Sequence, residues 1–353
     1  MSTEMPDVPR TTDRPKVVSG APTSEFQATA SYLELHAPAK TNFALNVGER
    51  GTLPRSAREG TAGCRHYIDT VYCSVGIYDD VDLTLKRRRS GFSLDLEGAN
   101  LGDLASDDAD MRSNLAVKAL FALAEHSGKA PDVGIRIFKR IPVAAGLGSG
   151  AADAAAVLVG LNRLWHLDYS LDQLRDIATP LGHGIPFCLT GGLLVGSNYG
   201  EAIEPVTASM AKQLGPELNF TTMLLGTYNQ GLSKAAVYAE LDRQRAEAAK
   251  LAEAGKTEDE DTAAAGHGSR DLRFGHNDLE PAVISLFPRA GAALEDAAAA
   301  AEGITTFVSG SGPTVVACLP DPKAMWKVIG AWKASRSVDR IVRVETPAEL
   351  EIS

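Results

Sequence analysis

The sequence has 353 residues, of which 44% are hydrophobic and 23% are charged. This balance is typical of a globular protein, and the length predicts two domains. The formal net charge of -10 argues against a nucleic-acid partner, whose phosphates would be repelled, but it still allows a local basic pocket for one small anion.

The cysteines and the apolar runs indicate a compartment. The four cysteines lack the close spacing of a zinc site or a redox pair, so we expect free thiols in a reducing environment. They are Cys64, Cys73, Cys188 and Cys318. No apolar run approaches the ~20 residues of a membrane span, and the first residues lack the apolar core of a signal peptide. We therefore expect a cytoplasmic protein with no membrane partner.

The first half of the chain begins with an extension and continues with a long strand. Residues 1–29 are rich in Pro, Thr, Ser and charge and lack hydrophobic periodicity, which predicts a flexible extension. From Ala30 the residues alternate as in a strand, which breaks at Pro38 and resumes, with Lys40 at the break. The next predicted elements are a loop over 49–63, a helix over 68–79, a strand over 81–86, a helix over 114–126 and a strand over 133–140.

A glycine-rich loop follows that strand, and the elements after it complete two predicted domains. They are helices over 152–165 and 171–181, strands over 191–196 and 221–228, a helix over 233–245, a helix over 276–300, strands over 304–310 and 315–320, a helix over 322–335 and a strand over 339–347. We interpret the Ala/Glu/Lys/Asp-rich tract over 246–270 as a solvated insertion, because it lacks an apolar face. The predicted domains cover residues 30–200 and 201–353.

The segment PVAAGLGSGAADAAA, residues 142–156, carries the clearest chemical signal. It follows a strand that ends in basic residues and opens an Ala-rich helix, so its backbone N–H groups and the helix dipole favour an anion. Gly146, Gly148 and Gly150 allow close approach and positive φ. The segment matches neither GxxxxGK[ST] nor a strict GxGxxG, and a flexible strand-to-helix turn is the alternative. We predict a loop that binds nucleotide phosphates.

Further motifs occur in a fixed order around this loop. They are APAKTN at 37–42, NLAVKA at 114–119, GLSKAAVYAELD at 231–242, HNDLEPA at 276–282 and VSGSGPT at 308–314. With the glycine loop, they resemble the GHMP kinases, and among these the family of 4-diphosphocytidyl-2-C-methyl-D-erythritol kinases, over about residues 31–345. The resemblance implies an α+β fold, with a ribosomal-protein-S5-like N-terminal domain and a ferredoxin-like C-terminal domain. The lack of a βαβ series argues against a Rossmann fold.

The resemblance also implies an activity and its residues. The family transfers a phosphoryl group from ATP, accompanied by Mg2+, to a hydroxyl group of a cytidine-diphosphate-linked sugar alcohol in the non-mevalonate isoprenoid pathway. It implies a catalytic role for Lys40, substrate binding by Asn42 and His66, and a place near the adenine for Asn114. The residues implied for nucleotide binding are Pro142, Val143, Ala144, Ala145, Gly146, Leu147, Gly148, Ser149, Gly150, Ala151 and Ala152. A second turn, Gly310, Ser311 and Gly312, is implied to close beside the phosphates.

The substrate loop and the first helical turn after the glycine loop require separate interpretations. The loop before His66 reads GCRH, with Arg65 where the family has a stacking aromatic residue. A planar guanidinium can also stack on a base, but this change leaves cytosine recognition open. We interpret Asp153 as a helix cap, because a carboxylate is favoured at a helix N-terminus.

Two departures from the family pattern concern catalysis. Ala151 stands where the family has a serine that helps to hold the Mg-bound phosphates, although Ser149 brings a hydroxyl two residues earlier. Gly184, in LGHGIPFCL, stands where the pattern LGxDVPFFL has the aspartate that serves as general base. Phosphoryl transfer depends mostly on positioning and electrostatics, and a base typically supplies ~10²–10⁴ in rate. His183 is a candidate substitute.

Three functions therefore stay open. The first is the kinase activity of the family. The second is a catalytically weak or dead paralogue that binds nucleotide in a regulatory role. The third is a GHMP kinase for another small alcohol, which the altered GCRH loop would suit.

Overall fold

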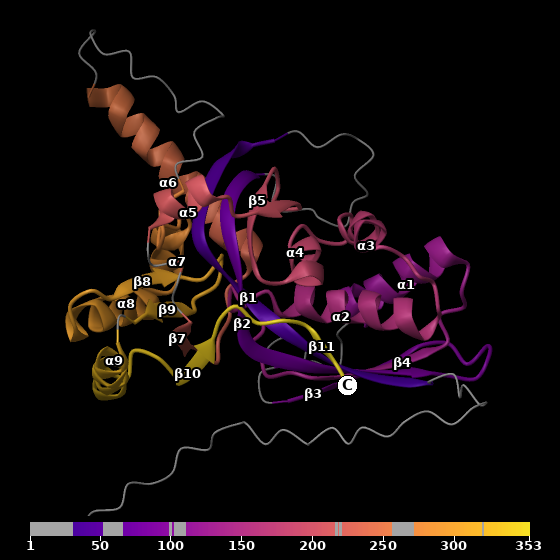
Figure 1. Cartoon of the computed structure of the whole chain (residues 1–353). Helices are drawn as coiled ribbons and strands as arrows, with labels where there is room; N and C mark the ends of the chain where they lie inside the picture. Colours follow the sequence, from indigo (N-terminus) through magenta and orange to yellow (C-terminus); the bar gives the residue numbers. More distant parts are fainter. Residues whose placement is uncertain are drawn as a thin grey trace, which may run out of the picture. The chain divides into compact units, whose positions relative to one another are not determined.

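Two β-sheets with their helices make up the fold. The computed structural model describes residues 31–51, 66–98, 101, 111–215, 218, 221–255, 272–319 and 321–353. The expected extension over 1–29 and the part of the expected insertion over 256–270 lie outside these residues. Figure 1 shows the elements in chain order, and Ser31–Ser353 form one compact unit.

Among the described residues, the first sheet has seven strands and the second has four. The first follows the order β11-β1-β2-β4-β3, with β5 paired to β2 and β6 paired to β5; the second follows β10-β7-β9-β8. The strands are β1 (Tyr32–Arg50), β2 (His66–Leu85), β3 (Ser93–Glu97), β4 (Val133–Phe138), β5 (Leu193–Ser197), β6 (Ala202–Pro205), β7 (Thr222–Thr227), β8 (Thr305–Val308), β9 (Val315–Cys318), β10 (Arg340–Glu345) and β11 (Glu351–Ile352). Numbered within the second sheet, this order is 4-1-3-2, and with helices between β7 and β8 and between β9 and β10 it gives the expected ferredoxin-like topology.

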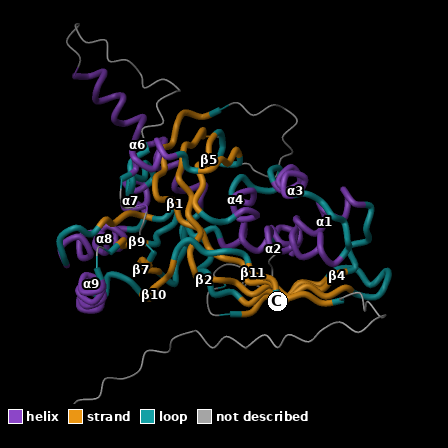
Figure 2. Tube along the Cα trace, in the orientation of Figure 1, coloured by secondary structure: helices purple, strands orange, loops and turns teal. Residues whose placement is uncertain are grey.

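The helices cover these sheets. They are α1 (Leu115–Ser127), α2 (Ser149–Leu164), α3 (Leu171–Ala178), α4 (Ile185–Thr190), α5 (Ala208–Leu214), α6 (Lys234–Gly255), α7 (Glu280–Leu286), α8 (Pro288–Ala300) and α9 (Pro322–Ser335). Helices α1 and α2 lie side by side on one face of the layer formed by β1, β2, β4 and β11 (Figure 2). In the second sheet's layer, the fully buried Trp332 of α9 donates a hydrogen bond from Nε1 to the carbonyl of Ala293 in α8, at 2.8 Å.

The break expected at Pro38 is a bulge within one long strand. The register between β1 and β2 shifts between Pro38 and Ala39, and the pairing continues beyond it. Proline cannot donate a ladder hydrogen bond, so an irregularity is expected there. Just after the bulge, the backbone N–H of Lys40 donates to the carbonyl of Leu147, at 2.9 Å. The bulge therefore fixes Lys40 against the glycine loop.

The helix expected over 68–79 is wrong, because these residues belong to β2. Strand β2 pairs with β1 along one edge and with β4 and β5 along the other. Every residue from Thr70 to Val75 is buried. A central strand that is covered on both faces shows no alternation of apolar and polar residues, so its pattern is easily taken for that of a buried helix.

Other helix predictions have wrong boundaries. The helix expected over 276–300 is two helices, α7 and α8, because Pro288 begins the second helix and Phe287 adopts a non-helical φ of -142°. The helix expected to end at Arg245 continues to Gly255, which is ten residues into the expected insertion. None of the described helices is long and apolar enough to cross a bilayer.

The predicted domain boundary near residue 200 stays a prediction. Strands β1 to β6 precede or lie close to that boundary and all belong to the first sheet. The last strand, β11, returns from the second half of the sequence and pairs with β1 through Leu35 and His36. The first sheet is therefore completed by residues from both ends of the described chain.

Candidate active site

The glycine loop runs into the N-terminus of α2. Helix α2 begins at Ser149, three residues before the predicted start, and Gly148 is its N-cap with a φ of 72°. Gly146 has a φ of 84°, and the non-glycine Ala144 also has a positive φ, of 54°. No side chain caps the helix. The first N–H groups of a helix lack intrahelical acceptors, so this end of α2 can accept an anion.

A second glycine turn packs against the first, backbone against backbone. A Cβ atom on Gly146 would lie 1.9 Å from the carbonyl oxygen of Ser309, and one on Gly312 would lie 1.9 Å from the carbonyl carbon of Ala145. The Ser309 hydroxyl donates to the Gly146 carbonyl at 3.1 Å, and the Thr41 hydroxyl donates to Ser309 Oγ at 2.9 Å. Only glycine fits at these two contacts, so the turn at 310–312 holds the shape of the glycine loop.

The side chain of Lys40 lies between these two turns. A Cβ atom on Gly148 would lie 2.7 Å from Lys40 Cγ, and one on Gly310 would lie 3.2 Å from Lys40 Nζ. The ammonium donates to Asn42 Oδ1 at 2.8 Å and lies 5.7 Å from the ring centroid of Tyr72. The expected catalytic Lys40 and the expected substrate-binding Asn42 are therefore brought together beside the glycine loop.

Lys40 has no carboxylate partner within the described part of the chain. Its hydrogen-bond acceptor is the neutral amide of Asn42, whose Nδ2 in turn donates to Thr70 Oγ1 at 2.7 Å. The pKa of Lys40 is lowered to about 8, mainly by burial and then by the positive charge of Lys234, while Cys188 opposes this effect. The site thus holds a cation without a counter-ion next to a helix N-terminus, an arrangement suited to phosphate.

Gly184 and Ala151, the two departures from the family pattern, face each other. Gly184 precedes α4 with a φ of -86°, which any residue can adopt. A Cβ atom on Gly184 would meet only the Cβ of Ala151, at 3.8 Å. The helices α2 and α4 that carry these residues pack together. Position 184 therefore has room for a side chain. The carboxylate expected there and the hydroxyl expected at position 151 are absent from the same place.

His183, the candidate substitute for the absent base, contacts Glu201 and Tyr199, and its role as a base stays a prediction. Its Nδ1 lies 3.2 Å from Glu201 Oε2, and its ring centroid is 5.5 Å from that of Tyr199. The glutamate is half-buried, and the contact with His183 helps to keep its pKa lowered against the effect of burial. The imidazole is thus directed toward the turn that carries Tyr199 and Glu201.

Ser149 and Asp153 belong to a buried lysine cluster, which we define as Asp79, Lys139, Ser149 and Asp153. Lys139 Nζ lies 2.6 Å from Asp79 Oδ2 and 2.5 Å from Asp153 Oδ2, and it also contacts Ser149 Oγ. All four side chains are buried. The interpretation of Asp153 as a cap is wrong, because it lies in the second turn of α2 and pairs with Lys139. The Ser149 hydroxyl is likewise engaged in the cluster.

This cluster ties the glycine loop to the first sheet. Asp79 Oδ1, from β2, accepts the backbone N–H groups of Arg140 and Ile141 at 2.6 and 2.8 Å, where the chain leaves β4 for the loop. Burial raises the pKa of Asp153 to about 7; Lys139 opposes this effect and the negative charge of Asp79 adds to it. The sequence offered one signal for the cluster, the basic end of the strand before the loop, but not its carboxylate partners.

His66 lies against α6 rather than against the glycine loop. It is the first residue of β2, and its side chain is 2% exposed, with Nε2 2.8 Å from Asp242 Oδ1. Its ring centroid is 5.1 Å from that of Tyr238, and Asp242 also binds Arg50 Nη2 at 2.7 Å. His66 Nδ1 is buried without a described hydrogen-bond partner. Arg65, the expected stacking residue, lies outside the described residues.

Asn114 caps the helix that neighbours the loop. Its Oδ1 accepts the backbone N–H of Ala116 at 2.8 Å, at the start of α1. A Cβ atom on Gly150 would lie 3.3 Å from Leu115 Cδ1, so the starts of α1 and α2 are adjacent. The observed role of Asn114 is to cap α1, and its contact with a nucleotide stays a prediction.

Known proteins are similar to this chain in fold and in sequence. Residues 114–192 match the family model of the GHMP kinases N terminal domain. The chain is 44% identical over 317 residues to the 4-diphosphocytidyl-2-C-methyl-D-erythritol kinase of Bifidobacterium longum subsp. infantis, an alignment that covers 89% of this chain and 90% of that protein. The chain belongs to the 4-diphosphocytidyl-2-C-methyl-D-erythritol kinase family.

A second relative and a solved structure support the same family. The chain is 35% identical over 327 residues to the 4-diphosphocytidyl-2-C-methyl-D-erythritol kinase of Mycobacterium tuberculosis, with 92% of this chain and 93% of that protein covered. A crystal structure of 4-(cytidine 5'-diphospho)-2C-methyl-D-erythritol kinase has the same fold, with a TM-score of 0.58 at 23% identity and with 89% of this chain and 99% of that chain covered. The expected α+β GHMP fold and the expected class, a small-molecule kinase, are confirmed.

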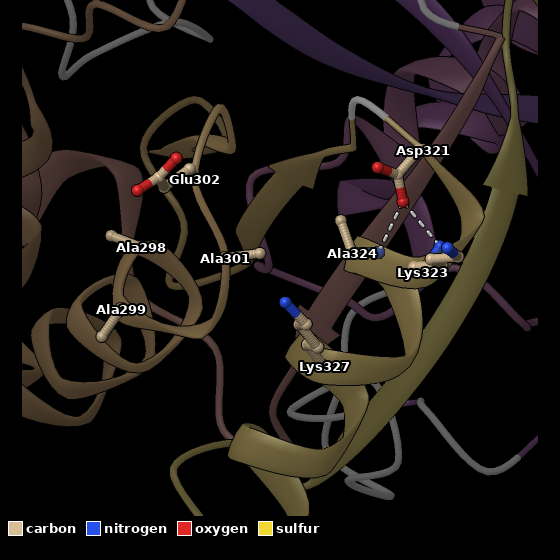
Figure 3. A pocket seen from close by; sticks show the side chains of 8 residues that line it. All are labelled: Ala298, Ala299, Ala301, Glu302, Asp321, Lys323, Ala324 and Lys327. Carbon is tan, nitrogen blue, oxygen red and sulfur yellow. Dashed lines mark hydrogen bonds between the residues drawn. The ribbon is translucent and has the colours of Figure 1, made fainter.

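Two further features of the structure are a surface hollow away from the glycine loop and the arrangement of side chains that could bind metal. A hollow of about 520 Å³ lies between the end of α8 and the start of α9, where Asp321 accepts the N–H groups of Lys323 and Ala324 (Figure 3). None of its lining residues belongs to the glycine loop or to the turn at 310–312. In the ranges that the structure describes, no group of three or more His, Cys, Asp and Glu side chains is arranged to hold a metal ion.

Proposed function

We propose that this chain transfers the terminal phosphoryl group of ATP to a hydroxyl group of 4-diphosphocytidyl-2-C-methyl-D-erythritol. The observation that carries the proposal is the Lys40 ammonium, which has no counter-ion among the described residues and lies between the glycine loop and the turn at 310–312. The names of relatives at 44% and 35% identity support this substrate. We place ATP on the glycine loop.

In this mechanism the chain works mainly by position and charge. The free N–H groups at the start of α2 bind the phosphates, and Lys40 stabilises the negative charge that spreads over the transferring phosphoryl group. The turn at 310–312 keeps the loop in shape through its contacts with Gly146. With glycine at position 184, no carboxylate of the described chain accepts the hydroxyl proton beside Lys40. We therefore expect turnover to be slow.

Mg2+ would arrive on the nucleotide. This cation prefers phosphate oxygens and water to a protein cage, and it would neutralise charge on the phosphates. We also propose that His66 and Asn42 bind the acceptor and that Asn114 lies near the adenine. The buried free thiols Cys73, Cys188 and Cys318 suit a reducing cytoplasm, in which we place the protein.

Turnover by the purified chain tests this function. The chain is incubated with ATP, Mg2+ and 4-diphosphocytidyl-2-C-methyl-D-erythritol, and the phosphorylated product is measured by mass spectrometry alongside ADP release. We expect a slow but measurable rate that the Lys40→Met variant loses. A wild-type chain that forms no phosphorylated product under these conditions would contradict the proposal.

A second candidate is a nucleotide-binding paralogue without normal turnover. The observation that favours it is that Gly184 and Ala151 face each other. The carboxylate and the hydroxyl of the family pattern are therefore absent from the same place. The Gly184→Asp variant separates the two candidates, because the position has room for the carboxylate. If the wild-type chain is inactive and this variant is active, the paralogue is the better description. If both are inactive, a screen of small alcohols tests the third function.

A further inference from the structure

Helix α6 begins at a point that is fixed against the glycine loop. The backbone N–H of Leu232 donates to the carbonyl of Ala144 at 2.9 Å. A Cβ atom on Gly231 would lie 2.5 Å from Ala144 Cβ and 2.7 Å from the carbonyl oxygen of Val143. The chain therefore touches the loop just before the helix starts at Lys234. The first turn of α6 therefore lies next to the glycine loop.

Lys234 is the cation that this arrangement brings to the site. Its side chain is exposed, and its Nζ lies 5.7 Å from the ring centroid of Tyr238, one turn further along the helix. The two arginines of α6 have carboxylate partners: Arg243 pairs with Glu240 and Glu247, and Arg245 pairs with Asp278. Lys234 has none within the described residues.

The charge of Lys234 reaches Lys40. After burial, it is the largest influence that lowers the pKa of Lys40. Two ammonium groups near each other repel, and neither has a carboxylate in the described chain to offset that repulsion. Such an arrangement is stabilised when an anion binds between or beside the two cations. A phosphate group is the anion that the neighbouring N-terminus of α2 already favours.

We propose that Lys234 is a second phosphate-binding cation of this site and acts together with Lys40 on a phosphate group of the bound ligands. This inference rests on the proposed function, because it assumes that a nucleotide occupies the glycine loop. The phosphate belongs either to ATP or to the diphosphate of the acceptor. In a site that lacks a carboxylate at Gly184 and a hydroxyl at Ala151, this cation adds binding energy for the phosphate.

Binding measurements on matched variants test the role of Lys234. The neutral variant is Lys234→Met, and Lys234→Arg retains the charge. The control is Lys250→Met, which removes the same charge from an exposed position of α6 that lies about 24 Å further along the helix at 1.5 Å per residue. Each variant is titrated calorimetrically with MgATP, adenosine, CDP and cytidine, so that each nucleotide is compared with its phosphate-free nucleoside.

We expect Lys234→Met to weaken the binding of MgATP or of CDP about tenfold, which is the usual size for a hydrogen bond to a charged group. The nucleotide that responds identifies the phosphate that Lys234 binds. Adenosine and cytidine should bind as to the wild type, and Lys234→Arg should retain most of the affinity. Lys250→Met should leave all four ligands unaffected.

Three outcomes would overturn the inference. Lys234→Met could bind both nucleotides as Lys250→Met does, it could weaken nucleosides and nucleotides equally, or Lys234→Arg could lose as much affinity as Lys234→Met. If the wild-type chain binds neither nucleotide, the proposed function fails together with this inference. If the wild type binds nucleotide and Lys234→Met binds it equally well, only the role of Lys234 fails.

Discussion

Lys40 is the residue on which the proposed chemistry of this site depends most. Its hydrogen-bond acceptor is the neutral Asn42 amide, at 2.8 Å, and its described surroundings supply a like charge from Lys234 but no carboxylate. These surroundings and burial lower the pKa of Lys40 to about 8, more than two units below the ordinary value of 10.5. The charge of Lys40 therefore changes within an accessible pH range.

This position of the pKa predicts the pH dependence of the enzyme. In the free enzyme, Lys40 is cationic below about pH 8 and loses its charge above that pH. We therefore expect kcat/KM to fall as the pH rises through 8. In Gly184→Asp, a carboxylate near the ammonium would stabilise the charged form, and the fall should move to higher pH. The measurement is kcat/KM from pH 6 to 10 for both proteins. A high-pH limb at the same position in both would show that Lys40 is not the titrating group or that position 184 does not reach it.

The sequence predicted the residues of this site better than their partners. Lys40, Asn42 and the glycine loop lie in short motifs whose meaning is local, and the structure brings them together. Ser149 was a candidate for replacing the missing hydroxyl of Ala151. Its hydroxyl contacts Lys139 and Asp79 instead, and Asp79 is 70 residues away in the sequence. No local pattern reveals which carboxylate a buried lysine meets.

Among the elements, α2 is the one whose placement decides the geometry of the loop. The buried lysine cluster joins its first two turns to β2 and to the end of β4. Two carboxylates share one ammonium in a buried place, so the ionised cluster carries an excess negative charge. The raised pKa of Asp153 follows from that burial, from the nearby Asp79 charge and from incomplete compensation by Lys139.

This cluster predicts how stability changes with pH. A carboxyl whose folded-state pKa is about 7, against 3.8 when unfolded, binds a proton more tightly in the folded state, so the free energy of unfolding falls as pH rises through that interval. Asp153→Asn keeps the shape and removes the titration. From pH 5 to 8, the wild type should lose roughly 2 kcal/mol relative to this variant, by the linkage of pKa to stability.

Urea denaturation at the two pH values measures this difference. The control is Asp176→Asn, an exposed aspartate on α3, which should follow the wild type at both pH values. A difference between Asp153→Asn and the wild type that does not depend on pH would contradict the raised pKa. A wild type that gains stability relative to the variant at pH 8 would show that Lys139 compensates Asp153 fully.

The element predictions were least accurate where the environment overrides the local pattern. Strand β2 was expected to be partly helical because its residues from Thr70 to Val75 are apolar or small without alternation. Its neighbours on both edges, which the sequence does not reveal, make it a central strand. The split between α7 and α8 was readable in principle from Pro288, since proline favours the start of a helix.

At the scale of the whole unit, backbone contacts hold the two halves together in addition to a hydrophobic core that contains residues of both sheets. The N–H of Leu45 in β1 donates to the carbonyl of His276 at 2.8 Å, and its carbonyl accepts the N–H of Asp278 at 2.9 Å. After β10, the chain returns to the first sheet at Ser74, which meets Thr346 and Ala348. The motifs predicted the fold class, but the short sequence of β11 carries no pattern that predicts its pairing with the first sheet.

Ser74 connects three segments with one hydroxyl. Its Oγ donates to the carbonyl of Ala348 and accepts the N–H groups of Ala348, at 3.1 Å, and of Gly192, at 2.9 Å. Ser74→Ala removes the hydroxyl partner of the Ala348 carbonyl and of the Gly192 N–H, whereas the Ala348 N–H keeps the Ser74 carbonyl at 3.3 Å. Unsatisfied buried groups cost about 1–3 kcal/mol each. The variant should therefore be less stable than the wild type by about 2 kcal/mol or more.

Because Ser74 lies on β2 in the centre of the first sheet and holds the segment that leaves β10, its loss should loosen both sheets together. Hydrogen exchange should become faster in β11 and in β10, while urea denaturation stays a single transition. The control is Ser127→Ala, whose hydroxyl at the end of α1 donates to the Leu123 carbonyl at 2.7 Å and accepts the Lys129 N–H at 3.4 Å, and which should change neither sheet. Faster exchange confined to residues 346–353, or a transition that splits in two, would mean that the returning segment does not couple the sheets.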